Sequence, residues 1–164
     1  MKSGAFLRVQ WGVWPGLLLL VWLVPTPVLA GQGGEPFVTP LSFEEMSGKQ
    51  AVFETELGTI AIDLRPDLAP NHVGLIMQLA GEGHFDGTTF HRMVANGIVQ
   101  GGDPLTADPE RAAEYDQGGL GLVDAEFSDA RHVRGAVSAV LVPGQPGSGG
   151  SQFFIRVVGH PGLA

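Results

Sequence analysis

The chain has 164 residues, enough for one domain, and its 17 acidic and 9 basic residues give a formal charge of −8. Such an acidic surface argues against nucleic acid and anionic membranes as partners. The sequence contains no cysteine, which excludes a disulfide framework.

Residues 1–30 have the pattern of a secretory signal peptide. Two basic residues, Lys2 and Arg8, precede an apolar run over 11–24, and small residues lead up to Ala30. We expect cleavage after Ala30 and therefore a periplasmic or secreted protein without stable membrane association. The alternative is an uncleaved membrane anchor, for which the apolar run falls short of the roughly 20 residues of a span.

The rest of the chain divides into a linker and a domain. Residues 31–50 are interrupted by glycine and proline, which predicts a flexible linker. The domain is expected over 51–164. It begins with β-prone and alternating residues over 51–64 around a Leu57-Gly58 turn, which predicts an antiparallel hairpin. The alternating apolar residues of its second strand are expected on the core side.

A helix is predicted after this hairpin. Pro70 fits its first position, where a missing amide donor costs nothing, and Gly81 fits its C-cap. Apolar side chains recur at helical spacing, at Val73, Ile76, Met77, Leu79 and Ala80. We interpret this stripe as the face that covers one end of a sheet. His72 and His84 flank the helix and are expected to be solvated.

A second hairpin is predicted over 90–104. Two apolar runs, 90–94 and 98–100, are joined by a segment that contains Asn96-Gly97, and both of these residues tolerate the positive φ of a tight turn. Arg92 lies within the first run, on the same face as the apolar residues two positions away. A guanidinium at that position requires either an acidic partner or a functional role.

The remaining sequence predicts loops and two further strands. Residues 105–121 predict a long polar surface loop, and strands are expected at 136–142 and 152–157. The glycine-rich loop at 143–150 lacks the Lys-Ser/Thr ending of a phosphate cradle, and its serines do not complete Gly-x-Ser-x-Gly. The histidines show no ligand spacing, so no metal site is expected.

Two motifs resemble the signature of the cyclophilins, a family of peptidyl-prolyl cis-trans isomerases. The first is Phe90-His91-Arg92 followed, after seven residues, by Gln100-Gly101-Gly102-Asp103, and the second is Gly150-Ser151-Gln152-Phe153-Phe154-Ile155. The resemblance covers residues 51–164. It implies a mainly β fold, an antiparallel eight-stranded β-barrel with capping helices, and isomerisation of X-Pro bonds without a cofactor or metal.

The resemblance also implies roles for individual residues. Arg92 matches the family's catalytic arginine, which donates to the prolyl nitrogen, and Gln100 matches the residue that holds this arginine and the substrate in position. Substrate-binding roles are implied for Phe154, Ile98, Gln152, Leu163, Val140, Leu141 and His91. Glu126-Phe127 resembles a family element that we interpret as packing rather than chemistry.

The sequence departs from the family pattern at three places. Gly97 stands where the family usually has a pocket phenylalanine, and Ala139-Val140-Leu141 replaces its usual Met-Ala-Asn. Family members continue beyond Leu163 into a final strand, so we expect the last strand or strands of the barrel to be missing and the sequence to be truncated or partial.

The expected function is that of an exported, monomeric isomerase. Its partners would be proline-containing peptides and unfolded or folding proteins, and its role would be to assist the folding of exported proteins. The alternative is a non-catalytic peptide-binding or chaperone module on the same fold, which Gly97 and the missing pocket wall favour. The intact Arg92 and Gln100 favour the enzyme, because a pure binding module has no evident need for them.

Overall fold

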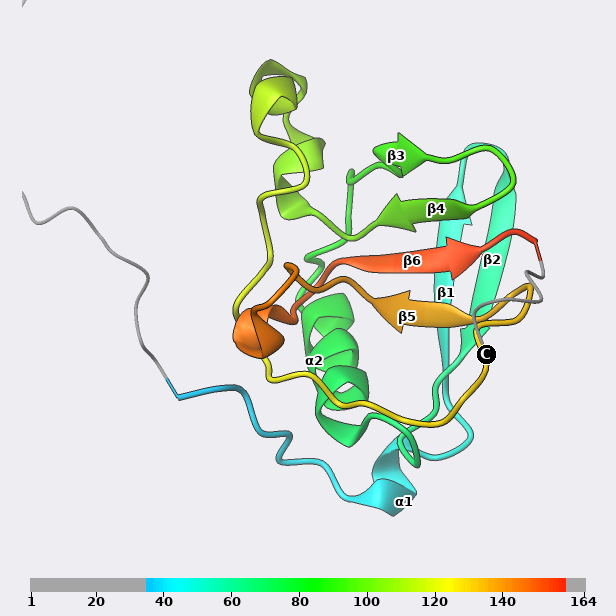
Figure 1. Ribbon diagram of the computed structural model, residues 1–164, viewed down its shortest axis with the longest axis vertical. Helices are drawn as coiled ribbons and strands as arrows, with labels where there is room; N and C mark the ends of the chain where they lie inside the picture. The colour runs from blue at the N-terminus through cyan, green and yellow to red at the C-terminus, as the bar shows by residue number, and fades with distance from the viewer. Residues whose placement is uncertain (1–34, 159–164) are drawn as a thin grey trace, which may run out of the picture. The chain divides into compact units, whose positions relative to one another are not determined.

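The computed structural model describes residues 35–158 (Figure 1). The expected signal peptide over 1–30 and the implied pocket residue Leu163 lie outside this range. The elements, in chain order, are α1 (Phe43–Met46), β1 (Gln50–Thr55), β2 (Gly58–Asp63), α2 (Pro70–Gly81), β3 (Arg92–Met93), β4 (Ile98–Gly101), the 3-10 helices η1 (Pro104–Ala107) and η2 (Pro109–Glu114), β5 (Val137–Ala139), η3 (Pro146–Ser148) and β6 (Phe153–Arg156).

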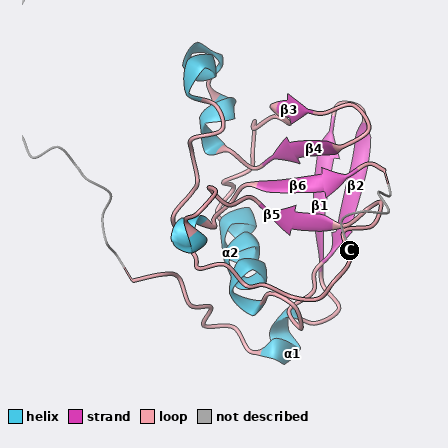
Figure 2. Ribbon diagram, viewed as in Figure 1, coloured by secondary structure: helices cyan, strands magenta, loops and turns pink. Residues whose placement is uncertain are grey.

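The strands form two antiparallel sheets (Figure 2). One contains only β1 and β2, and the other has the strand order β3-β4-β6-β5. Within residues 35–158 these sheets do not close into the expected eight-stranded barrel. In the part of the chain that the structure describes, no helix has the length and apolar character needed to cross a membrane.

The described part of the expected linker over 31–50 is built into the domain instead. Ser42 and Glu45 form a capping box at the start of α1, in which each side chain accepts from the other residue's backbone N–H. Met46, at the end of α1, is only 1% exposed, and Phe37 packs against the apolar core cluster. Glycine and proline shape this segment without making it a free tether, because its apolar side chains find partners.

The first hairpin confirms the predicted pairing. Ala51 lies opposite Ile62 and Thr55 opposite Gly58, so the turn falls at Glu56-Leu57, one residue before the expected place. The alternation of half-buried and exposed residues along β2 follows the predicted pattern. The two sheets meet through the rings of Phe53 and Phe153, whose centroids are 5.2 Å apart.

Helix α2 begins at Pro70 as predicted, but its buried face differs from the predicted stripe. Its buried residues are Val73, Gly74, Leu75 and Leu79, whereas Ile76 and Met77 are half-buried and Ala80 is exposed. Leu75 and Leu79 share a core cluster with Val123, a residue from a distant loop whose position periodicity does not reveal. The C-cap is Glu82 rather than Gly81, and Gly83 takes the positive φ of 73°.

The N-terminus of α2 is capped from far along the chain. Ala69, at the N-cap position, makes no side-chain capping bond. The carboxylate of Glu126 instead accepts from the backbone N–H of Asn71 at 3.0 Å and of His72 at 2.8 Å. A carboxylate oxygen of Glu126 also lies 2.8 Å from His72 Nδ1, so His72 is not solvated as expected. Phe127 is 82% exposed, which contradicts a packing role for this residue.

His84, expected to be solvated, is half-buried in the structure. Its ring meets the ring of Phe85 edge-on, with centroids 5.5 Å apart. Phe85 in turn packs against the core cluster of α2, so the histidine belongs to the end of that core.

Candidate active site

The β3–β4 hairpin brings the first sequence motif into register. The backbone N–H of Val94 donates to the carbonyl of Ile98 at 2.9 Å, and that of Gly97 donates to Val94 at 3.0 Å. Asn96 has a φ of 54°, whereas Gly97 does not need the positive φ that the sequence predicted for both. A Cβ at Gly97 would lie 3.1 Å from Cγ1 of Val94, so glycine suits the close packing of this turn.

Three of the implied site residues lie in one row across the four-stranded sheet. Arg92 of β3 is opposite Gln100 of β4, and Gln100 is opposite Phe154 of β6. Directly opposed residues of antiparallel strands project to the same face. Ile98, two residues before Gln100, projects to this face as well, opposite Arg156. Figure 1 shows β4 and β6 side by side between β3 and β5.

Polar side chains join this row into a hydrogen-bonded chain. Arg92 donates from NH1 to Oε1 of Gln100 at 3.1 Å. Gln100 donates from Nε2 to Oε1 of Gln152 at 3.0 Å and to Oδ1 of Asp116 at 2.5 Å. Gln152 in turn donates to the carbonyl of Gly118 at 2.7 Å. We refer to Arg92, Gln100, Gln152 and Asp116 as the polar row.

The members of the polar row differ in exposure. Gln100 and Gln152 are each only 1% exposed, whereas Arg92 is exposed to solvent. A guanidinium only donates and an ionised carboxylate only accepts, so the Gln100 amide must turn its oxygen toward Arg92 and its nitrogen toward Asp116. The arrangement therefore presents one exposed cation on a buried, fixed support.

The other implied substrate-binding residues differ in their neighbours and in how deeply they are buried. Val140 is adjacent to the polar row, because its backbone N–H donates to the carbonyl of Gln152 at 3.0 Å, and Leu141 beside it is half-buried. Phe154 is half-buried, with the ring of His132 centred 6.1 Å away. His91 does not reach the surface, since its side chain is 3% exposed.

His91 lies behind the row and faces the loop after η2. Its Nε2 is 3.6 Å from Oδ1 of Asp116, and its ring is 6.4 Å from that of Tyr115. Within the described residues neither ring nitrogen of His91 has a hydrogen-bond partner. The structure therefore places the His91 side chain next to Asp116, a member of the polar row.

Sequence reasoning missed Asp116, Gly118 and His132 as neighbours of the site. Asp116 and Gly118 lie within the segment predicted as a polar surface loop, and no local pattern distinguishes them there. Their positions depend on Asp103, which is the last residue of the first motif and is fully buried. Its carboxylate accepts from the backbone N–H of Leu105 at 2.8 Å and of Asp116 at 2.6 Å, which returns the loop to the sheet.

A backbone junction fixes the other end of this loop. Ser151 donates from Oγ to the carbonyl of Gly102 at 2.6 Å, and its backbone N–H donates to the carbonyl of Gly119 at 2.8 Å. A Cβ on Gly150 would collide with the carbonyl oxygen of Gly119, so only glycine permits this approach. The junction secures the loop next to Gln152.

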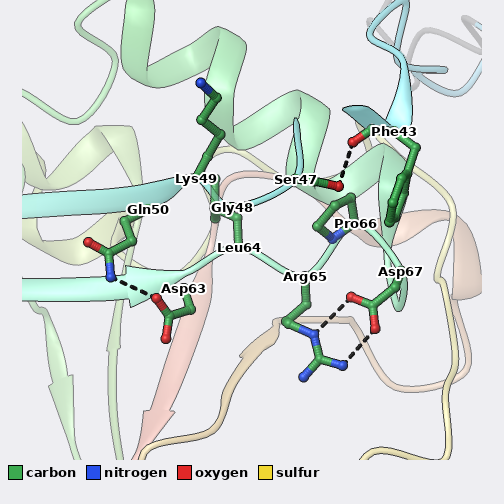
Figure 3. Close-up of a pocket in the computed structure, with 10 residues that line it drawn as sticks. All are labelled: Phe43, Ser47, Gly48, Lys49, Gln50, Asp63, Leu64, Arg65, Pro66 and Asp67. Carbon is green, nitrogen blue, oxygen red and sulfur yellow. Dashed lines mark hydrogen bonds and ion pairs between the residues drawn. The ribbon is translucent and has the colours of Figure 1, made fainter. Parts of the chain in front are cut away.

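A separate cavity of about 600 Å³ lies between α1 and the start of the first hairpin (Figure 3). Its lining residues include Lys49, Asp63, Arg65 and Asp67, and none belongs to the polar row. Arg65 makes a bidentate pair with Asp67 at 2.8 and 2.6 Å. The hydrogen bond from Arg65 lowers the pKa of the Asp67 carboxyl and raises the pKa of Arg65.

Comparisons with known proteins agree with the two motifs. Residues 51–163 match the family described as cyclophilin type peptidyl-prolyl cis-trans isomerase/CLD. A probable peptidyl-prolyl cis-trans isomerase of Brucella suis biovar 1 (strain 1330) is 41% identical over 111 residues, which cover 65% of this chain and 56% of the relative. A peptidyl-prolyl cis-trans isomerase of Synechococcus elongatus is 36% identical over 107 residues, 65% of this chain and 67% of the relative.

A solved structure gives the same result for the fold. The cyclophilin type peptidyl-prolyl cis-trans isomerase of Cryptosporidium parvum, crystallised in the presence of the dipeptide ala-pro, is similar with a TM-score of 0.59 and 25% identity. The similarity covers 70% of this chain and 72% of that one. The chain spans 56% of the length of the first curated relatives. The family match, the relatives and the shared fold together show that the chain belongs to the cyclophilin-type peptidyl-prolyl cis-trans isomerase family.

Proposed function

We propose that this protein catalyses the cis-trans isomerisation of X-Pro bonds in peptides and proteins. The observation that carries the proposal is the hydrogen bond between the exposed Arg92 and the buried Gln100, in one row with the half-buried ring of Phe154. These residues belong to the two motifs through which the chain resembles its family. The row offers a fixed cation beside an apolar surface, which suits the ring and the amide of a prolyl bond.

The reaction needs no covalent chemistry. Rotation about an X-Pro bond has a barrier of ~18–20 kcal/mol because amide resonance must be broken. As the bond twists, the lone pair of the prolyl nitrogen becomes localised and can accept a hydrogen bond. A guanidinium N–H of Arg92 would donate to it, and this bond would strengthen only in the twisted state, which lowers the barrier.

The other side chains would hold the substrate against Arg92. Gln100 fixes the guanidinium through its amide oxygen at 3.1 Å. Phe154 would form the floor of the proline pocket and Ile98 its wall, since both project to the face of the polar row. Val140, Leu141 and Gln152 would contact the peptide along the neighbouring strands, and Leu163 would complete the wall.

We further propose an exported protein that assists the folding of other exported proteins. The basis is the signal-peptide pattern of residues 1–30, which implies a periplasmic or secreted monomer. The eight-stranded barrel implied by the resemblance is part of the proposal, with both described sheets as its components. Expression with an intact N-terminus should give a species outside the cytoplasm that begins near Gly31 by intact mass. A membrane-bound species that retains residues 1–30 would support the anchor alternative.

The second candidate is a peptide-binding module without catalysis. It is favoured by Gly97, where the family usually has a pocket phenylalanine, because glycine contributes no side chain to a proline pocket. Exchange spectroscopy on an Ala-Pro peptide separates the two candidates. An isomerase produces cis-trans exchange peaks at substoichiometric protein, whereas a binding module shifts the peptide signals without exchange.

A further inference from the structure

We infer that Asp116 is a positioning residue, which orients the Gln100 side-chain amide so that its oxygen faces Arg92. The inference rests on the proposed function. Asp116 belongs to neither motif and lies in the loop after η2, yet its Oδ1 accepts from Nε2 of Gln100 at 2.5 Å. This contact joins an acidic side chain directly to the Arg92–Gln100 pair.

The Gln100 amide needs such a partner because its own torsion does not fix it. The terminal torsion of a glutamine is broad, so amide oxygen and nitrogen can exchange places at small cost. In the exchanged orientation the amide N–H groups would face the guanidinium of Arg92, and two donors would oppose each other. An ionised carboxylate can only accept, so Asp116 selects the orientation that Arg92 requires.

Gln152 supports the same orientation less directly. It accepts from the second N–H of Gln100 at 3.0 Å, but as an amide it could present either end. Its orientation is determined in turn by the carbonyl of Gly118. Asp116 is the acidic member of the polar row, and its hydrogen bond is expected to be the stronger of the two because charge strengthens it.

The backbone of Asp116 has an energetically unfavourable conformation. Within residues 35–158 only Asn96 and Asp116 are non-glycine residues with positive φ, at 54° and 75°. Such a conformation is unfavourable for a residue with a side chain. It is held by the bond from the Asp116 N–H to the buried Asp103 carboxylate at 2.6 Å. A glycine would suit this backbone better, which points to a use for the carboxylate.

The side-chain surroundings leave the carboxylate free for this use. The Asp116 side chain is 54% exposed, and among the described residues its one possible ionic partner is His91, with Nε2 3.6 Å away. The nearby acid Glu114 is paired with Arg111 at 2.6 Å and has no contact with Gln100 among the described residues. Glu114, the last residue of η2, therefore provides a matched control two residues before Asp116.

The test compares Asp116→Gly, Asp116→Asn and the control Glu114→Gly in the full chain. We expect Asp116→Gly to lower kcat on an Ala-Pro peptide about tenfold with KM within about twofold, because the lost bond supports the transition state. Asp116→Asn can present either end of its amide to Gln100, so its kcat should fall between those of Asp116→Gly and the parent, whereas Glu114→Gly should stay within about twofold of the parent. The melting temperature of Asp116→Gly should stay close to that of the parent, because the relief of a φ of 75° offsets the loss of the hydrogen bond to Gln100.

A second readout does not depend on activity. The side-chain amide protons of Gln100 should exchange slowly with solvent in the parent and in Glu114→Gly, and faster, with a shifted resonance, in Asp116→Gly. If the parent protein is inactive, the proposed function is wrong. The amide signals of Gln100 would still show whether Asp116 orients its side chain. Parent-like turnover and amide signals in Asp116→Gly, or equal impairment in Glu114→Gly, would overturn the inference.

Discussion

The two sheets of this protein bury different kinds of side chain. None of the residues of β1 and β2 is fully buried, and their half-buried positions alternate with exposed ones. In the four-stranded sheet, Gln100 and Arg156 are buried together with Phe153. The hairpin thus follows the simple rule of apolar residues inside, whereas the larger sheet places polar side chains where that rule excludes them.

This difference teaches where the proposed activity is located. A buried polar group is costly unless it is hydrogen-bonded, so the buried glutamines beside this sheet need partners. Gln100 and Gln152 meet this requirement through each other and through the loop around Asp116 and Gly118. The hairpin has no such demand and contributes packing, through Phe53 against Phe153.

The largest expected effect tests the apolar side of the comparison. Phe153 is 7% exposed and meets the rings of Phe53 and Phe90 at 5.2 and 6.2 Å. Phe153→Ala should lower the free energy of unfolding by about 3–5 kcal/mol, because it leaves a cavity where the two sheets meet. Chemical denaturation measures this loss. Phe127→Ala, at an 82% exposed ring, should change it by less than about 0.5 kcal/mol.

The next effect tests the buried polar side. Gln152→Leu would leave an N–H of Gln100 and the carbonyl of Gly118 without partners, which should cost about 1–3 kcal/mol of unfolding free energy. The control is Gln50→Leu in the first hairpin, where an exposed glutamine donates to Asp63 at 2.7 Å. Equal losses of unfolding free energy from both substitutions would mean that burial does not increase the contribution of the Gln152 hydrogen bonds to stability.

The third prediction tests the catalytic role of Arg92, and the expected change in free energy is smaller. Arg92→Ala should lower kcat/KM for an Ala-Pro peptide at least tenfold, or roughly 1.4 kcal/mol of transition-state stabilisation, with a lesser change in peptide affinity. Arg65→Ala removes another exposed guanidinium, which pairs with Asp67 just after the end of β2, and should leave turnover unchanged. A parent-like rate in Arg92→Ala would show that the donor has been wrongly identified.

The smallest expected effect is a pH dependence of stability, due to the pair of Arg65 and Asp67 at the end of the first hairpin. The hydrogen bond from Arg65 lowers the pKa of Asp67 when the chain is folded, so its small contribution to stability is present above the ordinary pKa and lost as pH falls through the lowered one. An NMR titration of the Asp67 carboxyl carbon should show this lowered pKa. In Arg65→Ala the pKa should return toward its ordinary value, and an unchanged titration would exclude the pair as the cause.

The sequence predicted those features that depend on neighbours in the chain. Alternation over 51–64 predicted the first hairpin, and Pro70 predicted the start of α2. The spacing of Phe90-His91-Arg92 and Gln100 predicted the family, and the register then placed Arg92 opposite Gln100. In each case the pattern and the structure it specifies lie within a few residues.

The features that sequence reasoning missed depend on partners far away in the chain. Leu75 is buried because Val123 covers it, which no helical period can show. Asp116 lies 16 residues after Gln100, in a loop whose path is determined by the buried Asp103. The segment before β1 has the glycine and proline content of a linker, yet its Met46 is buried. In all three cases a tertiary contact, and not a local sequence pattern, determines where the side chain lies.

The two ways of capping helices in this protein have a consequence for the order of folding. The capping box of α1 joins Ser42 and Glu45, only three residues apart, so it can form as soon as that turn is made. The N-terminus of α2 is capped by Glu126. This residue is 55 residues after Asn71 and 54 after His72, whose backbone N–H groups donate to it. Closing so long a loop is slow and costs chain entropy. The first turn of α2 should therefore be completed late, when the segment after Val123 has docked.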